Sequence, residues 1–511
     1  MSAATDIGTA RLPVFHPGRA TPDSLRRMAI LLIALILVGR LVLAAMVPLV
    51  PDEAYYALWG ANLSAGYLDH PPMIAVFIRL GTMLVGPGEF GVRLVCVLAT
   101  VPASVFIWRA ADLLITDRRA APLAAILFNV TLIGFLGMTL ATPDAPLVLF
   151  AAAMTYFAAR LTVDDRPRWW IAMGVATGLA MEAKYSGALF AAGFAAAVLA
   201  VPVLRRQLLR PWPWLALLIA ILVFAPNLIW NLEHGWATFT KQGGRVTSNW
   251  SFAPHYLAEL VAAQFGLATP LVFGFGLWGL TRAARSVYRP GGGRAVLLWM
   301  LLAPCAYFAF HALRSRVEGN WPAFLFPAFS IAAAAGMIAA MASSRPAIRR
   351  LTGFAIPVAL VLIALVGIHA ALVPVRTLGP RDPIIRMTRG WPDFARDADA
   401  LRQSIGANYI LTDNYQLNAK LARELPAVPV AQFNERQRYV SFAVPSEASL
   451  AGVGLVLSVN PDPAAVREHF GTAEPLGEVT RRFDGIDIVP AYAFRIEAPA
   501  GAENPSPLTS P

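Results

Sequence analysis

Charged residues are scarce in this sequence of 511 residues. Only 14% of its residues are Asp, Glu, Lys or Arg, whereas 57% are hydrophobic. An ordinary soluble chain carries about 25% charged residues. With so few charges the chain cannot cover itself with a solvated surface, which excludes a water-soluble enzyme of this length and a disordered chain. The composition therefore predicts a polytopic membrane protein.

Cysteine and lysine are also rare. The two cysteines, Cys96 and Cys305, lie far apart in apolar stretches, which excludes a disulfide framework and a cysteine metal site. Lysine occurs only at positions 184, 241 and 420, so arginine supplies most of the positive charge. The net charge of +11 would suit an acidic partner such as nucleic acid, unless the basic residues follow membrane topology.

Long apolar runs fill the first three quarters of the chain. A transmembrane helix needs ~20 mostly apolar residues. About eleven stretches approach this length, and they are 28–48, 89–111, 120–138, 143–161, 169–183, 186–204, 212–231, 257–281, 295–313, 321–342 and 352–373. The polar tail 1–27 precedes them, and no small-residue cleavage site follows the first run. We therefore expect an uncleaved signal-anchor followed by a transmembrane domain over 28–373.

Arginine gathers on one side of these spans. Twenty arginines fall in the N-terminal tail and in alternate loops, and the positive-inside rule makes this side cytoplasmic. An odd number of spans then places the chain from 374 onward on the opposite, outer side of a multi-pass membrane protein. That segment has 14 basic and 16 acidic residues. The charge of +11 is thus a topology signal and not a nucleic-acid footprint.

The segment 374–498 has the composition of a small domain. Short strands are predicted at 408–413, 427–432 and 452–459, and helices at 414–424 and 462–470. The Pro/Ser-rich end, 499–511, is expected to be disordered. The predicted fold is a polytopic α-helical membrane protein with a small C-terminal periplasmic α/β domain.

The few ionisable residues of the outer loops are the candidates for chemistry. The first outer loop, 49–88, holds acids and aromatics that an interfacial belt would also explain, followed by a short amphipathic run, 73–84, at the membrane surface. A cap at a helix start would explain Asp144 equally well, and snorkelling would explain a boundary lysine. Two arginines in the fifth outer loop break the positive-inside pattern, which favours a role in binding phosphate. The candidates in these loops are Asp52, Glu53, Tyr55, Tyr56, Asp69, His70, Asp144, Lys184, Tyr185, His234, Lys241, Arg245, Arg314, Arg316, Asn320 and Trp321.

Several short motifs give the chain a family resemblance. It resembles the polyprenyl-phosphate-sugar-dependent glycosyltransferases of the GT-C type, specifically bacterial relatives of the protein O-mannosyltransferases and of the lipid A aminoarabinose transferase. The motifs are PDEAYYALW with YLDHPPM, EFGVRL, TPDAPL, the pair Lys184-Tyr185, PNLIWNLEHGWATFTKQ, NWPA and TDNYQLNAKLARELP. The block DEAYY with DHPP is fairly specific, and the resemblance extends from about residue 50 to 445.

This resemblance implies a role for each group of candidates. Asp52 would be the catalytic base of an inverting attack, with Glu53 as an alternative base and Asp144 as a second acid that shapes the site. The donor phosphate would be bound by Lys184, Tyr185, His234, Arg314 and Arg316. Acceptor or donor sugar would contact Tyr55, Tyr56, Asp69, His70, Lys241, Arg245, Asn320 and Trp321. No cofactor is certain, and a divalent metal between Asp52 and Asp144 is left open.

The implied function is transfer of a sugar from a polyprenyl-phosphate donor to a hydroxyl or phosphate of an envelope acceptor on the periplasmic face. That acceptor is lipid A or lipopolysaccharide, another glycan, or a protein. A transporter or lipid flippase is the alternative, but the sequence has no internal repeat and few ionisable residues within spans. A non-catalytic scaffold would not need acids and a lysine on one membrane face.

Overall fold

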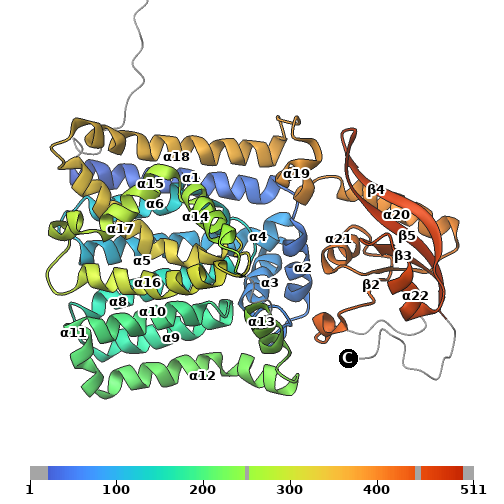
Figure 1. Ribbon diagram of the computed structural model, residues 1–511, viewed down its shortest axis with the longest axis horizontal. Helices are drawn as coiled ribbons and strands as arrows, with labels where there is room; N and C mark the ends of the chain where they lie inside the picture. The colour runs from blue at the N-terminus through green and yellow to red at the C-terminus, as the bar shows by residue number, and fades with distance from the viewer. Residues whose placement is uncertain (1–20, 248–251, 443–449, 499–511) are drawn as a thin grey trace, which may run out of the picture.

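A computed structural model of the chain describes residues 21–247, 252–442 and 450–498. The predictions for the first 20 residues and for 499–511 lie outside these ranges. Figure 1 shows a bundle of roughly parallel helices joined at one end to a smaller α/β domain. The helix α1 (Pro22–Met46) and the helix α18 (Pro346–Leu372) run side by side along one edge of the bundle.

Seven helical segments of the described chain are long and apolar enough to cross a membrane. They are α1, α4 with α5 (Glu89–Leu98 and Thr100–Leu114), α8 (Asp144–Leu161), α12 (Pro211–Glu233), α16 (Gly293–Ala312), η3 with α17 (Trp321–Leu325 and Phe326–Met341) and α18. Two bent pairs raise the number to nine if each counts as one span. They are α10 (Gly187–Ala200) with α11 (Pro202–Arg205) and η1 (Arg206–Leu209), bent by 93°, and α14 (His255–Leu267) with α15 (Pro270–Leu280), bent by 105°.

The expected count of eleven spans is therefore not confirmed. The two remaining stretches are helical but short. They are α6 (Ala120–Val130) with α7 (Leu132–Gly137), and α9 (Pro167–Ala183). Between α6 and α7, Thr131 leaves the helical conformation, and its hydroxyl accepts a bond from the backbone N–H of Gly134. Mean hydropathy over a window does not reveal such a break.

Arg40 of α1 stabilises this break. Its guanidinium is fully buried and donates to the side-chain oxygen of Asn129 at 2.7 Å and to the carbonyl of Gly134 at 2.9 Å. A broken helix leaves carbonyls without their usual partners, and leaving one unpaired in an apolar interior is costly. Arg40 thus satisfies backbone carbonyls inside the bundle, and its hydrogen bonds go to neutral groups.

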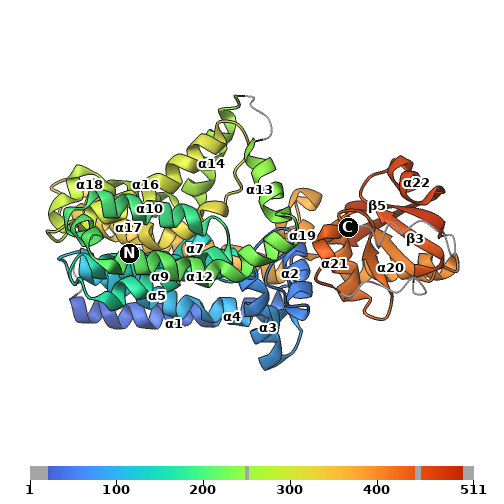
Figure 2. The ribbon, with the colours of Figure 1, turned by 90° about the horizontal axis from the view of Figure 1, so that it is seen from below.

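The first outer loop folds over the end of the bundle as two short helices. These are α2 (Pro51–Ala61) and α3 (Met73–Val85), which lie between the bundle and the C-terminal domain in Figures 1 and 2. The aromatic residues of this loop are buried, and the rings of Trp59 and Tyr67 stack at 4.1 Å. They form the core of the loop and do not line the membrane surface as an interfacial belt would. The fourth outer loop contributes α13 (Ala237–Thr247), and the segment η2 (Arg282–Val287) precedes α16.

The C-terminal domain contains a mixed five-stranded sheet in the order β2-β1-β3-β5-β4. The central strand β3 pairs in parallel with β1 and antiparallel with β5. The strands are β1 (Tyr409–Thr412), β2 (Val430–Gln432), β3 (Gly452–Ser458), β4 (Glu474–Phe483) and β5 (Ile486–Ala498). The helices are η4 (Gly379–Arg381), α19 (Pro383–Thr388), α20 (Trp391–Ser404), α21 (Tyr415–Glu424), η5 (Arg436–Tyr439) and α22 (Ala464–Phe470).

The predicted α/β domain is confirmed, and each of its three expected strands and two expected helices is present. The sequence analysis missed α20 and the long hairpin of β4 and β5. That hairpin carries charged residues along much of its length and mostly lacks the apolar alternation of a half-buried strand. Its pairing with β3 places it in the sheet.

The helix α21 fixes the C-terminal domain on the outer loops. Lys420 donates to the carbonyl of Leu49 at 3.3 Å, and Arg423 contacts Glu89 at 3.3 Å and donates to the carbonyl of Pro87 at 3.1 Å. Burial lowers the pKa of Lys420 to about 8, partly offset by the charge of Glu424. The domain therefore covers the end of the bundle where the outer-loop candidates lie.

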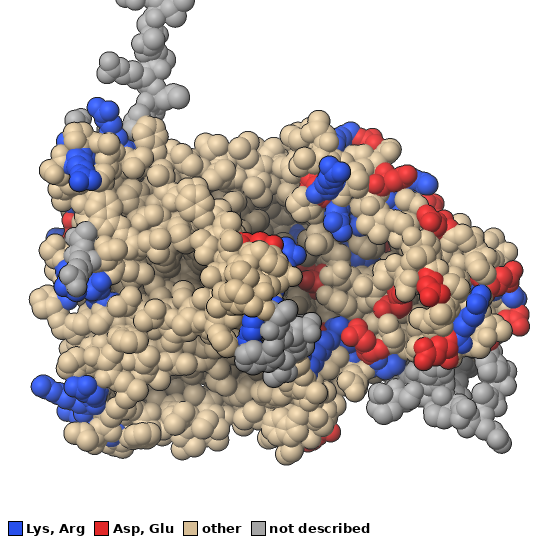
Figure 3. All heavy atoms as spheres, in the orientation of Figure 1, with Lys and Arg blue, Asp and Glu red and all other residues tan. Residues whose placement is uncertain are grey.

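The two ends of the bundle differ in charge. Figure 3 shows Lys and Arg side chains at the end farthest from the C-terminal domain, and acidic and basic groups together at the opposite end. The same view shows a hollow between the bundle and the C-terminal domain, with charged groups of both signs inside it. This distribution agrees with a cytoplasmic arginine-rich end, while the orientation in the membrane stays a prediction.

Candidate active site

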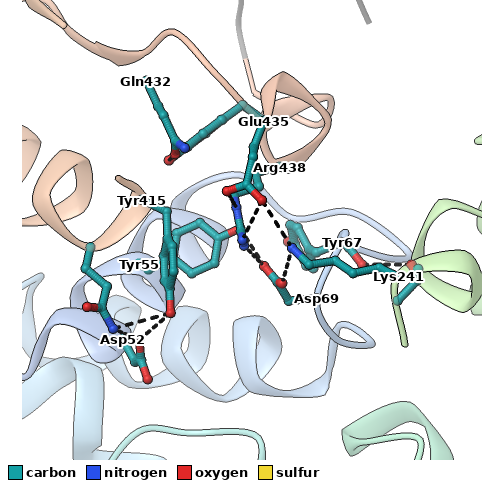
Figure 4. Close-up of polar contacts among 12 residues, drawn as sticks. Asp52, Tyr55, Tyr67, Asp69, Lys241, Tyr415, Gln432, Glu435 and Arg438 are labelled. Atoms are coloured by element: carbon teal, nitrogen blue, oxygen red, sulfur yellow. Dashed lines mark hydrogen bonds and ion pairs between the residues drawn. The ribbon is translucent and has the colours of Figure 1, made fainter. Parts of the chain in front are cut away.

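Asp52 occupies the first turn of α2 and is partly exposed. Its Oδ1 accepts a hydrogen bond from the Tyr415 hydroxyl at 3.1 Å and one from Gln416 Nε2 at 2.8 Å (Figure 4). Burial, followed by the negative charge of Asp52, raises the pKa of Tyr415, so the phenol keeps its proton and donates. Two neutral donors thus orient the carboxylate and leave it partly accessible.

Glu53 is held in a different environment from its neighbour. It is fully buried, and both of its oxygens contact the guanidinium of Arg93, with Arg93 Nε at 2.7 Å from Oε1. The backbone N–H groups of Val50 and Ala141 also donate to it, at 3.0 and 2.8 Å. These bonds tie α2 to α4 and to the second outer loop, so Glu53 is a structural anchor whose lone pairs are already used.

A second cluster joins three of the outer-loop candidates. The carboxylate of Asp144, at the start of α8, is buried; its Oδ1 lies 2.8 Å from Lys184 Nζ, and its Oδ2 accepts from Asn320 Nδ2 at 2.6 Å. Lys184 follows the last residue of α9 and is 12% exposed. The cluster places one partly buried cation at the outer ends of α8 and α9, beside the segment that leads into η3.

Tyr185, between α9 and α10, and His234, directly after α12, both contact residues of α12. The hydroxyl of Tyr185 donates to Asn227 at 2.9 Å and accepts from Asn231 at 3.3 Å. His234 stacks on Trp230 at 4.1 Å, and its Nδ1 contacts the carbonyl of the same residue. Both side chains are thus held by contacts with α12. This helix lies next to α9, which ends directly before Lys184.

A third cluster surrounds Asp69 (Figure 4). Its carboxylate accepts from Tyr55 at 3.1 Å, lies 3.0 Å from Lys241 Nζ of α13, and forms an ion pair with Arg438 of the C-terminal domain. Burial favours the neutral acid, but the charges of Arg438 and Lys241 outweigh it and hold the pKa of Asp69 below its usual value. Glu435 pairs with the same two cations, at 3.8 Å from Lys241 and 2.8 Å from Arg438. The cluster links the first outer loop, α13 and the C-terminal domain.

The remaining candidates differ in their surroundings. Arg316 is exposed and pairs with the surface acids Glu259 and Glu318 at 3.6 and 3.9 Å, which does not support a phosphate-binding role. Arg314 packs over the ring of Phe310. Tyr56 and His70 lie with their rings 6.2 Å apart, Trp321 packs against His311, and the side chain of Arg245 is outside the described part.

The residues do not fit a divalent metal between Asp52 and Asp144. Lys184 and Asn320 already engage both oxygens of Asp144, and an ammonium beside a carboxylate competes with a cation for it. Within the described ranges no three acidic, histidine or cysteine side chains gather as a metal site would require. We therefore derive no step through a metal.

An apolar cleft opens beside the Asp144 cluster. Its volume is about 290 Å³, and almost all of its wall is carbon, from α14, α15, α16 and the segment η3–α17. Gln264, on its wall, donates to the carbonyl of Gly319, one residue before Asn320. A long apolar chain fits the chemistry of this cleft.

Sequence reasoning missed the residues that the C-terminal domain brings to the site. Tyr415 and Gln416 belong to a stretch that contributed to the family resemblance, but nothing in their local pattern assigns them a role. Arg438 and Arg93 gave no separate signal. Each becomes visible only through a partner that is distant in the sequence, Asp52, Asp69 or Glu53.

The fold is similar to that of multi-pass membrane glycosyltransferases of the GT-C type, as the resemblance implied. Residues 69–230 match the family model described as dolichyl-phosphate-mannose-protein mannosyltransferase. A curated relative, the lipid A galacturonosyltransferase RgtD of Rhizobium johnstonii, is 28% identical over 390 residues, which cover 72% of this chain and 76% of RgtD. The transporter alternative gains no support from these matches.

Solved structures show the same fold. ArnT of Cupriavidus metallidurans bound to undecaprenyl phosphate superposes with a TM-score of 0.62 at 16% identity, covering 92% of this chain and 98% of ArnT. The apo form of ArnT gives a TM-score of 0.56 at 15% identity, covering 95% and 99% of the two chains. The match includes the C-terminal domain, since it extends over nearly the whole of both chains.

Proposed function

We propose that the chain transfers a sugar from a polyprenyl-phosphate donor to a hydroxyl of lipid A or of a closely related envelope glycolipid, at the periplasmic face of the inner membrane. The curated relative acts on lipid A, and one ArnT structure holds undecaprenyl phosphate. The observation that carries the proposal is the geometry of Asp52, an oriented and partly exposed carboxylate at the end of a membrane bundle, beneath the C-terminal domain.

In the proposed reaction Asp52 accepts the proton of the acceptor hydroxyl as its oxygen attacks the anomeric carbon of the donor. The bond between that carbon and the phosphate oxygen breaks, and polyprenyl phosphate leaves with the bonding electrons. Attack opposite the leaving group inverts the anomeric centre. General-base catalysis of this kind typically contributes ~10²–10⁴-fold to the rate.

Lys184 is the residue we assign to the departing phosphate. It lies in a buried cluster, where a positive charge stabilises developing negative charge more than it would in water. Asp144 and Asn320 hold it in place, and the apolar cleft beside Asn320 would take the first isoprene units. The donor requires no nucleotide site, because its sugar already carries a phosphate leaving group.

Reconstitution of the full chain in lipid vesicles tests the proposal. Vesicles that contain a polyprenyl-phosphate sugar and lipid A should yield lipid A heavier by one sugar residue, detected by mass spectrometry, and free polyprenyl phosphate in equal amount. Candidate donor sugars are supplied one at a time. Release of polyprenyl phosphate without glycosylated lipid A, in the presence of a peptide acceptor that gains the sugar instead, would reassign the acceptor to protein.

A further inference from the structure

A second pocket lies on the C-terminal domain side of Asp52. Its volume is about 210 Å³, and its wall includes Pro51, Arg386, Trp391, Asn414, Gln416 and Arg481. It is distinct from the apolar cleft because two guanidinium groups and two side-chain amides contribute to its surface. None of the roles proposed above uses it.

The pocket carries positive charge that no carboxylate neutralises. Arg481 is 6% exposed, stacks on Trp391 at 4.0 Å, and donates to the carbonyls of Arg389 and Arg386 at 2.8 and 2.7 Å. Within the described chain, no Asp or Glu lies within ion-pair distance of Arg481 or Arg386. The equally buried Arg438, by contrast, has Asp69 and Glu435 as partners. A buried cation that is oriented but not neutralised is a site for an anion, because desolvated charge is stabilised by a counter-charge.

The position of the pocket connects it to the reaction. Pro51 directly precedes Asp52, and Gln416 lies on the pocket wall while it donates to Asp52 at 2.8 Å. A group bound in the pocket therefore lies one side chain away from the base. An acceptor held there by one substituent would have its neighbouring hydroxyls within reach of Asp52.

The surroundings of the pocket favour a lipid. The helix α18 leaves the bundle at Leu372, and the segment that follows exposes apolar side chains before it reaches the pocket. These exposed residues are Leu372, Val375, Leu378 and Met387, and Met387 lies on the pocket wall. Such a strip at the end of a membrane-spanning helix is suited to the boundary between headgroups and acyl chains.

We propose that this pocket binds a phosphate of the acceptor glycolipid. Arg386 and Arg481 are the anion-binding residues, and the apolar strip contacts the acyl chains of the glycolipid. The assignment rests on the proposed function, since it names the part of the acceptor that the enzyme recognises. In this proposal the role of the C-terminal domain is to orient the acceptor over Asp52.

Arg386→Gln is the informative variant, because Arg386 is exposed and its backbone carbonyl, which the substitution keeps, is the group that accepts from Arg481. Removing one charge-assisted bond to a phosphate should raise the acceptor KM at least tenfold and leave the donor KM unchanged. Arg381→Gln is the matched control, because Arg381 is also exposed, lies five residues before Arg386 and is outside the pocket. This variant should change neither constant. Wild-type enzyme should show the same rise in acceptor KM when bis-phosphorylated lipid A is replaced by its monophosphoryl or dephosphorylated form.

Binding measured without turnover separates this inference from the proposed function. Native mass spectrometry of the full chain in detergent should show one bound lipid A that is lost in Arg386→Gln and kept in Arg381→Gln. Lipid A that binds through Arg386 without any sugar transfer would support the pocket and refute the function. Transfer with an unchanged acceptor KM in Arg386→Gln would refute the pocket alone. Displacement of the lipid by millimolar inorganic phosphate would show that the pocket recognises the free anion, and would overturn the lipid assignment.

Discussion

Gln416 of the C-terminal domain donates a 2.8 Å hydrogen bond to Asp52 of the first outer loop, across 364 positions of sequence. The C-terminal domain therefore takes part in the site as well as covering it.

Asp52→Asn should lower kcat by ~10²–10⁴-fold, because the amide cannot accept the acceptor proton. Steady-state transfer kinetics on the reconstituted enzyme measure this loss, and native mass spectrometry should show donor lipid still bound. Full activity in Asp52→Asn would remove Asp52 as the base.

Gln416→Ala should lower kcat less than Asp52→Asn does, by roughly tenfold, because it removes one orienting hydrogen bond and leaves the carboxylate in place. Gln403→Ala is the matched control, since Gln403 is exposed on α20 and contacts only Asp399. Equal kcat values for the two glutamine variants would mean that the bond between Gln416 and Asp52 has no part in catalysis.

Lys184→Met should raise the donor KM about tenfold or more, since a buried charge-assisted contact to phosphate is lost. The substitution also leaves Asp144 without its cation, so the single variant has two explanations. The double variant Lys184→Met, Asp144→Asn separates them. If Lys184 only neutralises Asp144, the double variant recovers the wild-type donor KM; if it binds phosphate, the KM stays high.

Glu53→Gln should destabilise the protein, because it leaves the buried guanidinium of Arg93 without a counter-charge. Breaking one partner of such a pair typically costs ~3–5 kcal/mol of unfolding free energy. Thermal unfolding in detergent should show a clearly lower midpoint for Glu53→Gln than for Asp52→Asn. A Glu53→Gln enzyme that is as stable as wild type and catalytically dead would instead make Glu53 the base.

The Asp69 cluster should make the outer assembly sensitive to acid. The pKa of Asp69 is lower in the folded chain than its ordinary value of 3.8. Its ionised form therefore stabilises the fold fully above that value, and the contribution disappears as the pH falls through the lower folded value. Unfolding free energies measured between neutral pH and about pH 3 should fall more steeply for wild type than for Asp69→Asn. Parallel pH curves for the two proteins would assign the acid sensitivity to other groups.

The orientation of the chain is a separate prediction. Enzymatic reporters fused after residue 374 should be active in the periplasm, because the arginine-rich end is expected to face the cytoplasm. A fusion after Arg206, between two expected spans, provides the cytoplasmic control. A cytoplasmic signal from the first fusion would place the site on the other side of the membrane and contradict the proposed acceptor.

The family resemblance and the α/β domain could both be predicted from the sequence, because short motifs and strand patterns are local. The number of spans could not. The break at Thr131 lies beside Arg40 of another helix, which donates to Asn129 before the break and to Gly134 after it. Likewise, Arg316 looked like a phosphate ligand because it violates a topology rule, but its nearest charges are the surface acids Glu259 and Glu318.

The sequence by itself determined the membrane class, the side on which arginine collects, and a small set of outer-loop acids and cations. These follow from composition and spacing, since a bilayer excludes charge wherever the chain passes through it. The tertiary structure showed that Asp52 and Glu53 have different surroundings. Adjacent residues on a helix point about 100° apart, so only packing shows which of the two contacts Arg93 and which contacts Gln416. It also decided that Gln416, Tyr415 and Arg438 belong to the site, because no local pattern encodes contacts between segments more than 300 residues apart.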